Sequence, residues 1–431
     1  MKLRNQLLAL VCLLVFIGFG FVFFHNWVEQ KPFGIILFVT DGLSTNTLAA
    51  TRLYQNGANE RLAVESFPHL ALLRNASNDY AVPDAAAAAT SIATGIKGNN
   101  RALAMEPGGK PIVSILALAH DAGRGTGLIS TGDLTDPTPA AFYAHATDAK
   151  DRQAIAEQLI GSDFVDITLG GGLSNFTPES KGGLRKDGRD LWLELRGKGH
   201  SLTRTKAELE STPAFLTTPL TGIFADTDLA FSSQMESGSQ QPSLSDMVRR
   251  SIQFLQNNRR GYLLVIDAAL VSRAAEQNKG ERVLSETADF DRAVATALQY
   301  AGEKALILCI GKSDLGGLSL NGHPLRDDHG VALLGTNAAG YPALTWSTGP
   351  NGPRKNDPSA QSQLSANPTA SPSPAATPAA AAESAEPAAF GTAQAIPTAR
   401  DMIGVATGPG SEGLNGFIDN TEIFKIIQKG L

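Results

Sequence analysis

Gly34-Ile-Ile-Leu-Phe-Val-Thr-Asp41 is a short, uninterrupted apolar run that ends in an aspartate. Two later stretches have the same character, Gly261-Tyr-Leu-Leu-Val-Ile-Asp267 and Lys304-Ala-Leu-Ile-Leu-Cys-Ile-Gly311. Continuous apolar runs of this length are typical of parallel strands that are buried on both faces. The sequence therefore predicts a central sheet that contains these three segments as strands.

Helical patterns lie between the predicted strands. Apolar residues keep a 3.6-residue period from Leu244 to Leu255, and Pro242-Ser243 before them offers an N-cap. Residues 287–298 show a similar period. Strands that alternate with helices predict an α/β fold with a central, mostly parallel sheet.

Two of the predicted strands end in an aspartate, Asp41 and Asp267. In parallel sheets, ligands gather beyond the carboxyl ends of the strands. A single aspartate at such a place is more often a cap for the helix or turn that follows it. Two of them, beside the segment described next, favour a functional site at this edge of the sheet.

Between the first two predicted strands lies Val82-Pro-Asp-Ala-Ala-Ala-Ala-Ala-Thr90, followed by Ala93-Thr-Gly-Ile-Lys97. This segment resembles the nucleophile segment of alkaline phosphatases, which reads Asp-Ser-Ala-Ala-x-Ala-Thr. Residues 131–145, 166–172, 222–226 and 242–247 are similar to further motifs of that family in order and spacing. The resemblance covers nearly the whole body and implies the family's fold, a three-layer α/β sandwich.

In that family a serine follows the aspartate and is phosphorylated during turnover, but here its place is taken by Ala85. A methyl group cannot attack phosphorus. Thr90 and Ser91 lie a full turn or more along the expected helix, so the strand–helix junction no longer aims them at a substrate. We therefore expect no catalytic residue in this segment.

The resemblance implies two zinc ions in the family's site, and their ligands are substituted in this chain. The positions that match the first zinc ion hold Ser272, Glu276 and Pro397. At the second, Lys312 and Ser313 stand where an aspartate and a histidine are usual. Because a lysine puts a cation where a dication should bind, bound Zn²⁺ is not expected.

Oxygen ligands survive where the zinc ligands do not. By resemblance, Asp41, Asp136, Thr138 and Asp267 fall where the family has its magnesium ligands and its metal-bridging aspartate. All four side chains offer oxygen, which suits a hard cation that keeps several waters. The hypothesis is a retained Mg²⁺ site. The alternative is that these side chains hydrogen-bond strand ends and loop backbone.

The substrate-binding arginine of the family has no direct counterpart. Its position by resemblance is Ala149, with Lys150 and Arg152 nearby as a shifted clamp, although only arginine offers phosphate a planar fork. His145 is expected to be a hydrogen-bonded, half-buried side chain. The cluster His323-Pro-Leu-Arg-Asp-Asp-His329 has metal-compatible side chains, but its turn-like context favours a solvated loop.

The first residues predict export and membrane attachment. Residues 1–6 are basic and residues 7–24 form an uninterrupted apolar run, which at about 1.5 Å per residue can cross a hydrocarbon core. We expect a transmembrane signal anchor with residues 1–6 in the cytoplasm. The protein would then be single-pass in the cell membrane, with the body, residues 33–431, exported. The alternative is a signal peptide that is cleaved late, which gives the same compartment.

The composition of the chain limits the kinds of partner that we expect it to bind. The net charge is −6 and no basic block is present, so nucleic acid is not an expected partner. Cys12 lies in the apolar run and Cys309 in a predicted strand, which argues against an intrachain disulfide. Residues 351–396 are dominated by Ala, Pro, Ser and Thr and are expected to be a disordered insert in the body.

Two classes of function remain. The first is a membrane-anchored pseudophosphatase, catalytically inactive, with a binding or structural role. The second is a divergent metal-dependent hydrolase of phosphate or sulfate esters that activates water directly and uses Lys312 at the leaving group. Combined loss of the nucleophile and the zinc ligands favours the first class. Analogy with the family suggests a homodimer, and the sequence identifies no protein partner.

Overall fold

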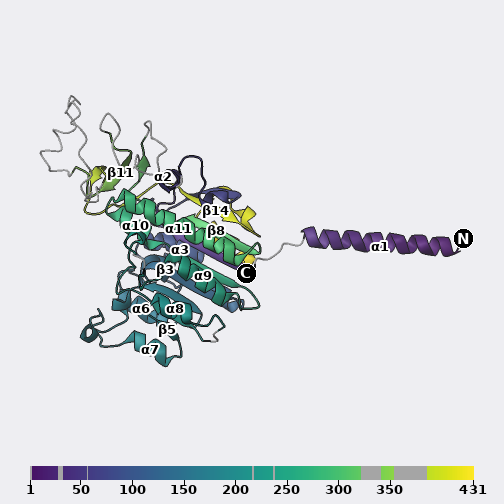
Figure 1. Cartoon of the computed structure of the whole chain (residues 1–431), viewed down its shortest axis with the longest axis horizontal. Helices are drawn as coiled ribbons and strands as arrows, with labels where there is room; N and C mark the ends of the chain where they lie inside the picture. The colour runs from purple at the N-terminus through teal and green to yellow at the C-terminus, as the bar shows by residue number, and fades with distance from the viewer. Residues whose placement is uncertain are drawn as a thin grey trace.

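A ten-stranded sheet forms the centre of this computed structural model, which describes residues 2–27, 33–55, 57–215, 218–235, 238–321, 341–353 and 386–431 (Figure 1). One strand is antiparallel to both of its neighbours, and the other neighbouring pairs are parallel. The antiparallel strand is β14, and the order across the sheet is β15 (Gly416–Asp419), β2 (His69–Arg74), β14 (Met402–Thr407), β8 (Ala305–Gly311), β1 (Gly34–Thr40), β7 (Tyr262–Asp267), β3 (Gly125–Asp133), β4 (Ile167–Gly171), β6 (Leu220–Ile223), β5 (Ser201–Thr203). The predicted α/β fold with a mostly parallel sheet is confirmed.

The three apolar runs of the sequence form adjacent central strands. β1 pairs in parallel with β7 on one side and with β8 on the other. Every residue of these strands is buried, as their apolar character on both faces requires. Because the strands are parallel and in register, their carboxyl ends lie at the same edge of the sheet.

Helices cover both faces of the sheet and complete three layers (Figure 1). Side chains of α3, α4, α5, α6, α7 and α13 pack on one face, and those of α2, α8, α9 and α11 pack on the other. The bounds are α2 (Thr45–Gln55), α3 (Ala85–Thr94), α4 (Ile115–Asp121), α5 (Pro137–Ala140), α6 (Arg152–Gly161), α7 (Leu191–Gly197), α8 (Lys206–Ser211), α9 (Leu244–Leu255), α10 (Ala269–Glu276), α11 (Gly280–Ala301) and α13 (Glu422–Gly430).

The predicted helix at 244–255 is α9. Its N-cap is Ser243, whose Oγ accepts a hydrogen bond from the backbone N–H of Asp246 at 3.2 Å. Residues 287–298 lie within the longer helix α11. The 3.6-residue period therefore located both helices and set the bounds of the first.

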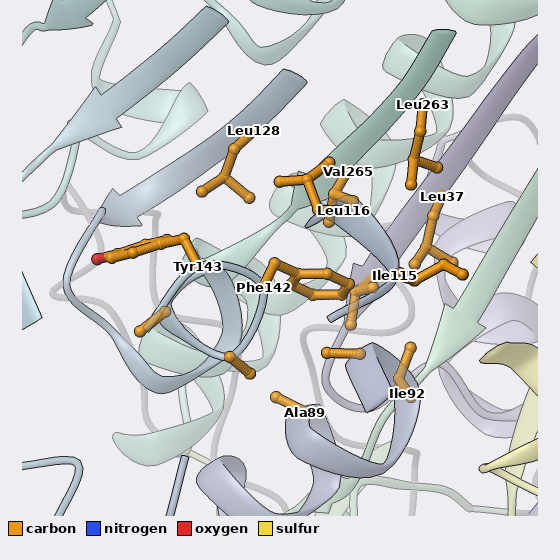
Figure 2. Close-up of a cluster of buried hydrophobic side chains, with 14 of the residues drawn as sticks. Leu37, Ala89, Ile92, Ile115, Leu116, Leu128, Phe142, Tyr143, Leu263 and Val265 are labelled. Carbon is orange, nitrogen blue, oxygen red and sulfur yellow. The ribbon is translucent and has the colours of Figure 1, made fainter. Parts of the chain in front are cut away.

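One apolar cluster fixes α3 against the sheet, as Figure 2 shows. Phe142, in the turn after α5, lies between Leu37 and Val265 of the sheet and Ala89 and Ile92 of α3. All of these side chains are almost fully buried. Close packing of this kind holds the start of α3 beside the carboxyl ends of the strands.

The N-terminal segment forms α1 (Lys2–Trp27), which exposes apolar side chains such as Leu7, Phe16 and Phe19. Within the described part of the chain, no helix is both long enough and apolar enough to cross a membrane.

Two small sheets lie beyond the central one: β10 (Ser319–Leu320) with β11 (Leu344–Gly349) and β12 (Ala388–Gly391), and β9 (Asp314–Leu315) with β13 (Pro397–Thr398). β12 falls inside residues 351–396, which the sequence predicts to be disordered. That prediction is wrong for β12, because it pairs in parallel with β11 and buries Ala388 in an apolar cluster. Residues 354–385 of the predicted insert lie outside the described residues.

Candidate active-site pocket

A cavity of about 230 Å³ opens at the carboxyl ends of the central strands. The positions that sequence reasoning assigned to the nucleophile and to the metals all line it. They are Asp41, Ala85, Asp136, Thr138, Asp267, Ser272, Glu276, Lys312, Ser313 and Pro397. Loops and helix ends that are far apart in sequence therefore meet at one place.

Ala85, which forms part of the cavity wall, is the first residue of α3. Asp84 caps this helix, and its carboxylate accepts hydrogen bonds from the backbone N–H groups of Ala87 (2.9 Å) and Arg101 (2.6 Å). The helix ends at Gly95, whose φ of 73° lies in the left-handed region. The turn that would aim a nucleophile into the cavity is therefore kept, while the residue at its tip carries only a methyl group.

Thr90 and Ser91 are fully buried inside α3. The Thr90 hydroxyl accepts a hydrogen bond from Ala104 N at 3.0 Å, and the Ser91 hydroxyl donates to Ala87 O at 3.1 Å. Neither residue lines the cavity described above. These hydroxyls serve the packing of the helix, so they are not substitutes for the missing serine.

Asp41, the residue after β1, holds three side chains that stand at zinc-ligand positions. Lys312 Nζ and Ser272 Oγ donate to its Oδ2, and Ser313 Oγ donates to its Oδ1. Asp41 is 5% exposed and Lys312 is 2% exposed. We call Asp41, Ser272, Lys312 and Ser313 the Asp41 cluster. The side chains that replaced zinc ligands thus bind the surviving aspartate directly.

The Asp41 cluster is a compensated pair of buried charges. Burial alone would raise the pKa of Asp41, but the Lys312 ammonium and the three hydrogen bonds hold this pKa below its ordinary value. Asp41 is therefore an ionised carboxylate whose partner is an amino-acid cation. Loss of either partner would leave the other charge buried and unpaired, which is strongly destabilising.

Asp136, in the turn after β3, is bound by two arginines. Arg273 Nη2 donates to its Oδ2, and Arg152 Nη2 lies 2.5 Å from its Oδ1. Arg273 also donates through Nε to Asp228 Oδ2 at 2.7 Å. Burial raises the pKa of Asp136, and the two guanidinium groups oppose this shift. We call Asp136, Arg152, Arg273 and Asp228 the Asp136 cluster.

Asp267, the last residue of β7, is 2% exposed and accepts a hydrogen bond from Ser130 Oγ at 2.8 Å. Burial raises its pKa to about 7, and the Lys312 charge opposes this shift. Thr138 is buried in the short helix α5 and lines the same cavity. Two of the predicted magnesium ligands are therefore not bound by an amino-acid cation in the contacts that the structure gives them.

Glu276 and Pro397 form the outer wall of the cavity. The Glu276 carboxylate lies 3.4 Å from Arg273 Nη1, and burial raises its pKa. Its backbone oxygen accepts a hydrogen bond from Ala395 N at 2.9 Å, which ties α10 to the segment that leads into β13. Pro397 pairs with Leu315 across the small sheet of β13 and β9, and its side chain has no atom that can bind a metal.

This set of donors does not fit zinc. A lysine, two serines, a glutamate and a proline stand at the implied ligand positions, and the lysine ammonium is already bound to the Asp41 carboxylate. Among the residues that the structure describes, no group of three or more His, Cys, Asp or Glu side chains is placed to hold a metal ion.

Magnesium does not fit the geometry either. The sequence suggested Asp41, Asp136, Thr138 and Asp267, but Asp41 binds an ammonium and Asp136 binds two guanidinium groups. A divalent cation would have to displace these charges or share their carboxylates. The predicted Mg²⁺ site is therefore not supported, and the reason is that fixed cations already compensate two of its ligands.

Arg152, which the sequence suggested as part of a shifted phosphate clamp, has other partners as well as Asp136. Arg152 Nη1 donates to Thr135 Oγ1 at 3.3 Å and lies 3.6 Å from Asp133 Oδ2, while Ala149 is buried and Lys150 is exposed. His145 is half-buried, with Nδ1 3.0 Å from Ala104 O. The predicted loop cluster at 323–329 lies outside the described residues.

Sequence reasoning missed Arg273 as a site residue. It follows Ser272 directly in α10 and lines the cavity, where it connects Asp136, Asp228 and Glu276. Its place beside a substituted ligand position was a signal in the sequence. Its partner Asp136 is 137 positions earlier in the chain, so the ion pair could only be found in three dimensions.

Comparison with known proteins agrees with the motifs. Residues 34–431 match the family model of alkaline phosphatase. Alkaline phosphatase 4 of Bacillus subtilis is 28% identical over 424 residues, which cover 92% of this chain and 89% of that protein. Alkaline phosphatase of Escherichia coli is 29% identical over 335 residues, which cover 67% of this chain and 71% of that protein.

Solved structures show the same fold. Thermus thermophilus alkaline phosphatase superposes with a TM-score of 0.71 at 23% identity, covering 94% of this chain and 93% of that chain. The alkaline phosphatase of the Antarctic bacterium TAB5 gives a TM-score of 0.70 at 24% identity, covering 93% and 98%. Members of this family normally use Zn²⁺ and Mg²⁺, and the Mg²⁺ of the M3 site is present in a TAB5 variant. By the match over nearly its whole body, this chain belongs to the alkaline phosphatase family.

Proposed function

We propose that this protein is a pseudophosphatase, a family member that keeps the fold but not the hydrolysis of phosphate esters, and that acts through binding or assembly. One observation carries the proposal. The Lys312 ammonium binds Asp41 in a cavity where Ala85 puts a methyl group in the place of the nucleophile. The family's reaction needs a nucleophile and metal ions. Here the nucleophile position holds an alanine, and a carboxylate at the metal positions is bound by a lysine.

The rest of the cavity supports the same proposal. The only arginine lining the described cavity, Arg273, is bound to Asp136 and Asp228, and Arg152 is bound to Asp136. Neither guanidinium group is free to receive a phosphate without giving up a carboxylate partner. Substrate binding at this place would cost two ion pairs before any chemistry began.

Hydrolysis of p-nitrophenyl phosphate tests the proposal. The purified full-length protein is assayed with zinc, with magnesium and with a chelator. Since traces of a host alkaline phosphatase would give the same signal, an Asp41→Asn variant prepared in the same way is the control. We expect the same background rate for both proteins under every condition.

The alternative function, a divergent hydrolase with metal-activated water, gives a different result. Wild-type hydrolysis of a phosphate or sulfate ester would then exceed that of Asp41→Asn and disappear with the chelator. A metal-dependent rate that is lost in Asp41→Asn would overturn the pseudophosphatase proposal. A rate that is equal in both proteins supports it.

We also propose that residues 7–24 attach the protein to the cell membrane, with the body exported. The support is the uninterrupted apolar run, preceded by Lys2 and Arg4. Alkaline carbonate extraction of membranes from producing cells tests this proposal. Retention in the membrane pellet is expected, and release of the full-length chain into the supernatant would contradict it.

A further inference from the structure

Several acidic side chains line this small cavity, and they need positive charge nearby if they are to stay ionised together. Asp41, Asp136, Asp267 and Glu276 all line a space of about 230 Å³. Buried carboxylates that lie near one another repel and favour protonation. A fold that keeps these residues must therefore supply positive charge at the same place.

We propose that Lys312 and Arg273 are built-in counter-ions that replace metal ions in the structure of the pocket, so that this protein reaches its full stability without a divalent cation. This role in stability does not depend on whether the protein hydrolyses esters. The substitutions at the metal positions are then a coordinated exchange of metal ions for amino-acid cations.

Lys312 is placed to join three elements. Its backbone follows β8, and its N–H donates to Thr40 O at the end of β1 at 2.9 Å. Its ammonium binds Asp41, which also accepts a hydrogen bond from Ser272 of α10. The ammonium therefore compensates Asp41 where β1, β8 and α10 meet, as a metal ion shared by ligands from several elements would do.

Arg273 performs the same task on the other side of the cavity. Its guanidinium group binds Asp136 after β3, Asp228 after β6, and Glu276 one turn along α10. A planar group with several donors can satisfy carboxylates from different directions at once. Two amino-acid cations thus bind every carboxylate that lines the cavity except Asp267, which accepts a hydrogen bond from Ser130 Oγ at 2.8 Å.

Thermal unfolding of the full-length protein in detergent tests this directly. The midpoint is measured with excess chelator, with zinc and with magnesium. We expect the midpoint to be the same in all three conditions, because no native metal ion is removed or added. A midpoint that falls with the chelator, or rises with zinc or magnesium in a way that Asp41→Asn abolishes, would overturn the proposal.

A Lys312→Met variant tests the counter-ion itself. Lys304→Met is the matched control, since Lys304 is exposed and lies just before the other end of the same strand, β8. We expect Lys312→Met to lower the unfolding midpoint by about 5 °C or more and the control to leave it unchanged. A wild-type midpoint for Lys312→Met would refute the role of Lys312. If Lys312→Met does not fold, the insensitivity of the wild type to chelator and metals decides the question.

Discussion

The Asp41 and Asp136 clusters lie in one cavity but compensate their carboxylates in different ways. Asp41 has one cation, Lys312, and both residues are almost fully buried. Asp136 shares two arginines with Asp228 and Asp133, and the side chain of Arg152 is 35% exposed. The first cluster depends on a single buried ion pair, whereas the second is a branched network with one partly exposed arginine. We therefore expect the first to be sensitive to one substitution and the second to be tolerant.

The largest effect is expected from Lys312→Met. Breaking a buried pair on one side leaves an uncompensated carboxylate and costs about 3–5 kcal/mol of unfolding free energy. Adding Asp41→Asn should recover part of this loss, because no unpaired charge then remains. Denaturant titration of both single variants and the double variant measures this coupling. Strictly additive losses would contradict the ion pair.

A buried carboxylate that forms no ion pair with the residues that the structure describes provides a reference. Glu286 in α11 accepts hydrogen bonds from Ser232 N (2.6 Å) and Ser232 Oγ (2.7 Å), and burial raises its pKa to about 7. Between the ordinary pKa of a glutamate, 4.5, and about 7, the folded state binds more protons than the unfolded state. The free energy of unfolding therefore falls as the pH rises through this window, by up to about 3 kcal/mol.

Glu286→Gln should remove this dependence while keeping an oxygen that can accept from Ser232. The unfolding free energy of the variant minus that of the wild type is expected to be larger at pH 8 than at pH 5. Denaturant midpoints of both proteins at the two pH values provide the measurement. An equal difference at both values would show that Glu286 does not titrate as its burial implies.

Arg273→Met should have a smaller effect than Lys312→Met. Asp136 keeps Arg152 as a partner, so the loss is that of charge-assisted hydrogen bonds, about 2 kcal/mol. Denaturant titration beside Lys312→Met compares the two clusters directly. A loss as large as that of Lys312→Met would mean that the branched network gives no tolerance.

Arg152→Met tests the exposed end of the same network. Because this side chain is partly in water and Asp136 keeps Arg273, we expect a loss of only about 0.5 kcal/mol. The effect should shrink further at high salt, which screens exposed pairs more than buried ones. A loss above that of Arg273→Met would reverse the order of the two arginines.

The smallest effect is expected from Ala85→Ser. The residue lies in the first turn of α3 at the cavity wall, where a hydroxyl adds little volume. With Lys312 bound to Asp41, no metal activates the new hydroxyl, so phosphatase activity should stay at background. Assay of this variant with zinc and magnesium provides the check. Hydrolysis above the Asp41→Asn control would show that only the nucleophile had been lost.

The position of the site could be predicted from the sequence because it depends on local patterns. Apolar runs identified β1, β7 and β8, and parallel strands bring residues such as Asp41, Asp267 and Lys312 to one edge. The motif around Ala85 placed the start of α3 at the same edge. These inferences needed only the type of each element and its order along the chain.

The pairing of charges within the site could not be predicted in the same way. Lys312 and Arg273 reach Asp41 and Asp136 across 271 and 137 positions of sequence, and their contacts depend on side-chain direction. The same limit explains β12, where an Ala-rich segment becomes a strand by pairing with distant residues of β11. Non-local contacts thus determine both the charge pairing in the site and the strand β12.

The metal content of the purified protein tests the central claim most directly. Wild-type protein and the Asp41→Asn variant are dialysed to equilibrium against zinc and magnesium, and bound metal is measured by elemental analysis. The account predicts the same metal content in both proteins, because Lys312 already compensates Asp41. A stoichiometric zinc or magnesium ion that is present in the wild type and absent from Asp41→Asn would contradict it.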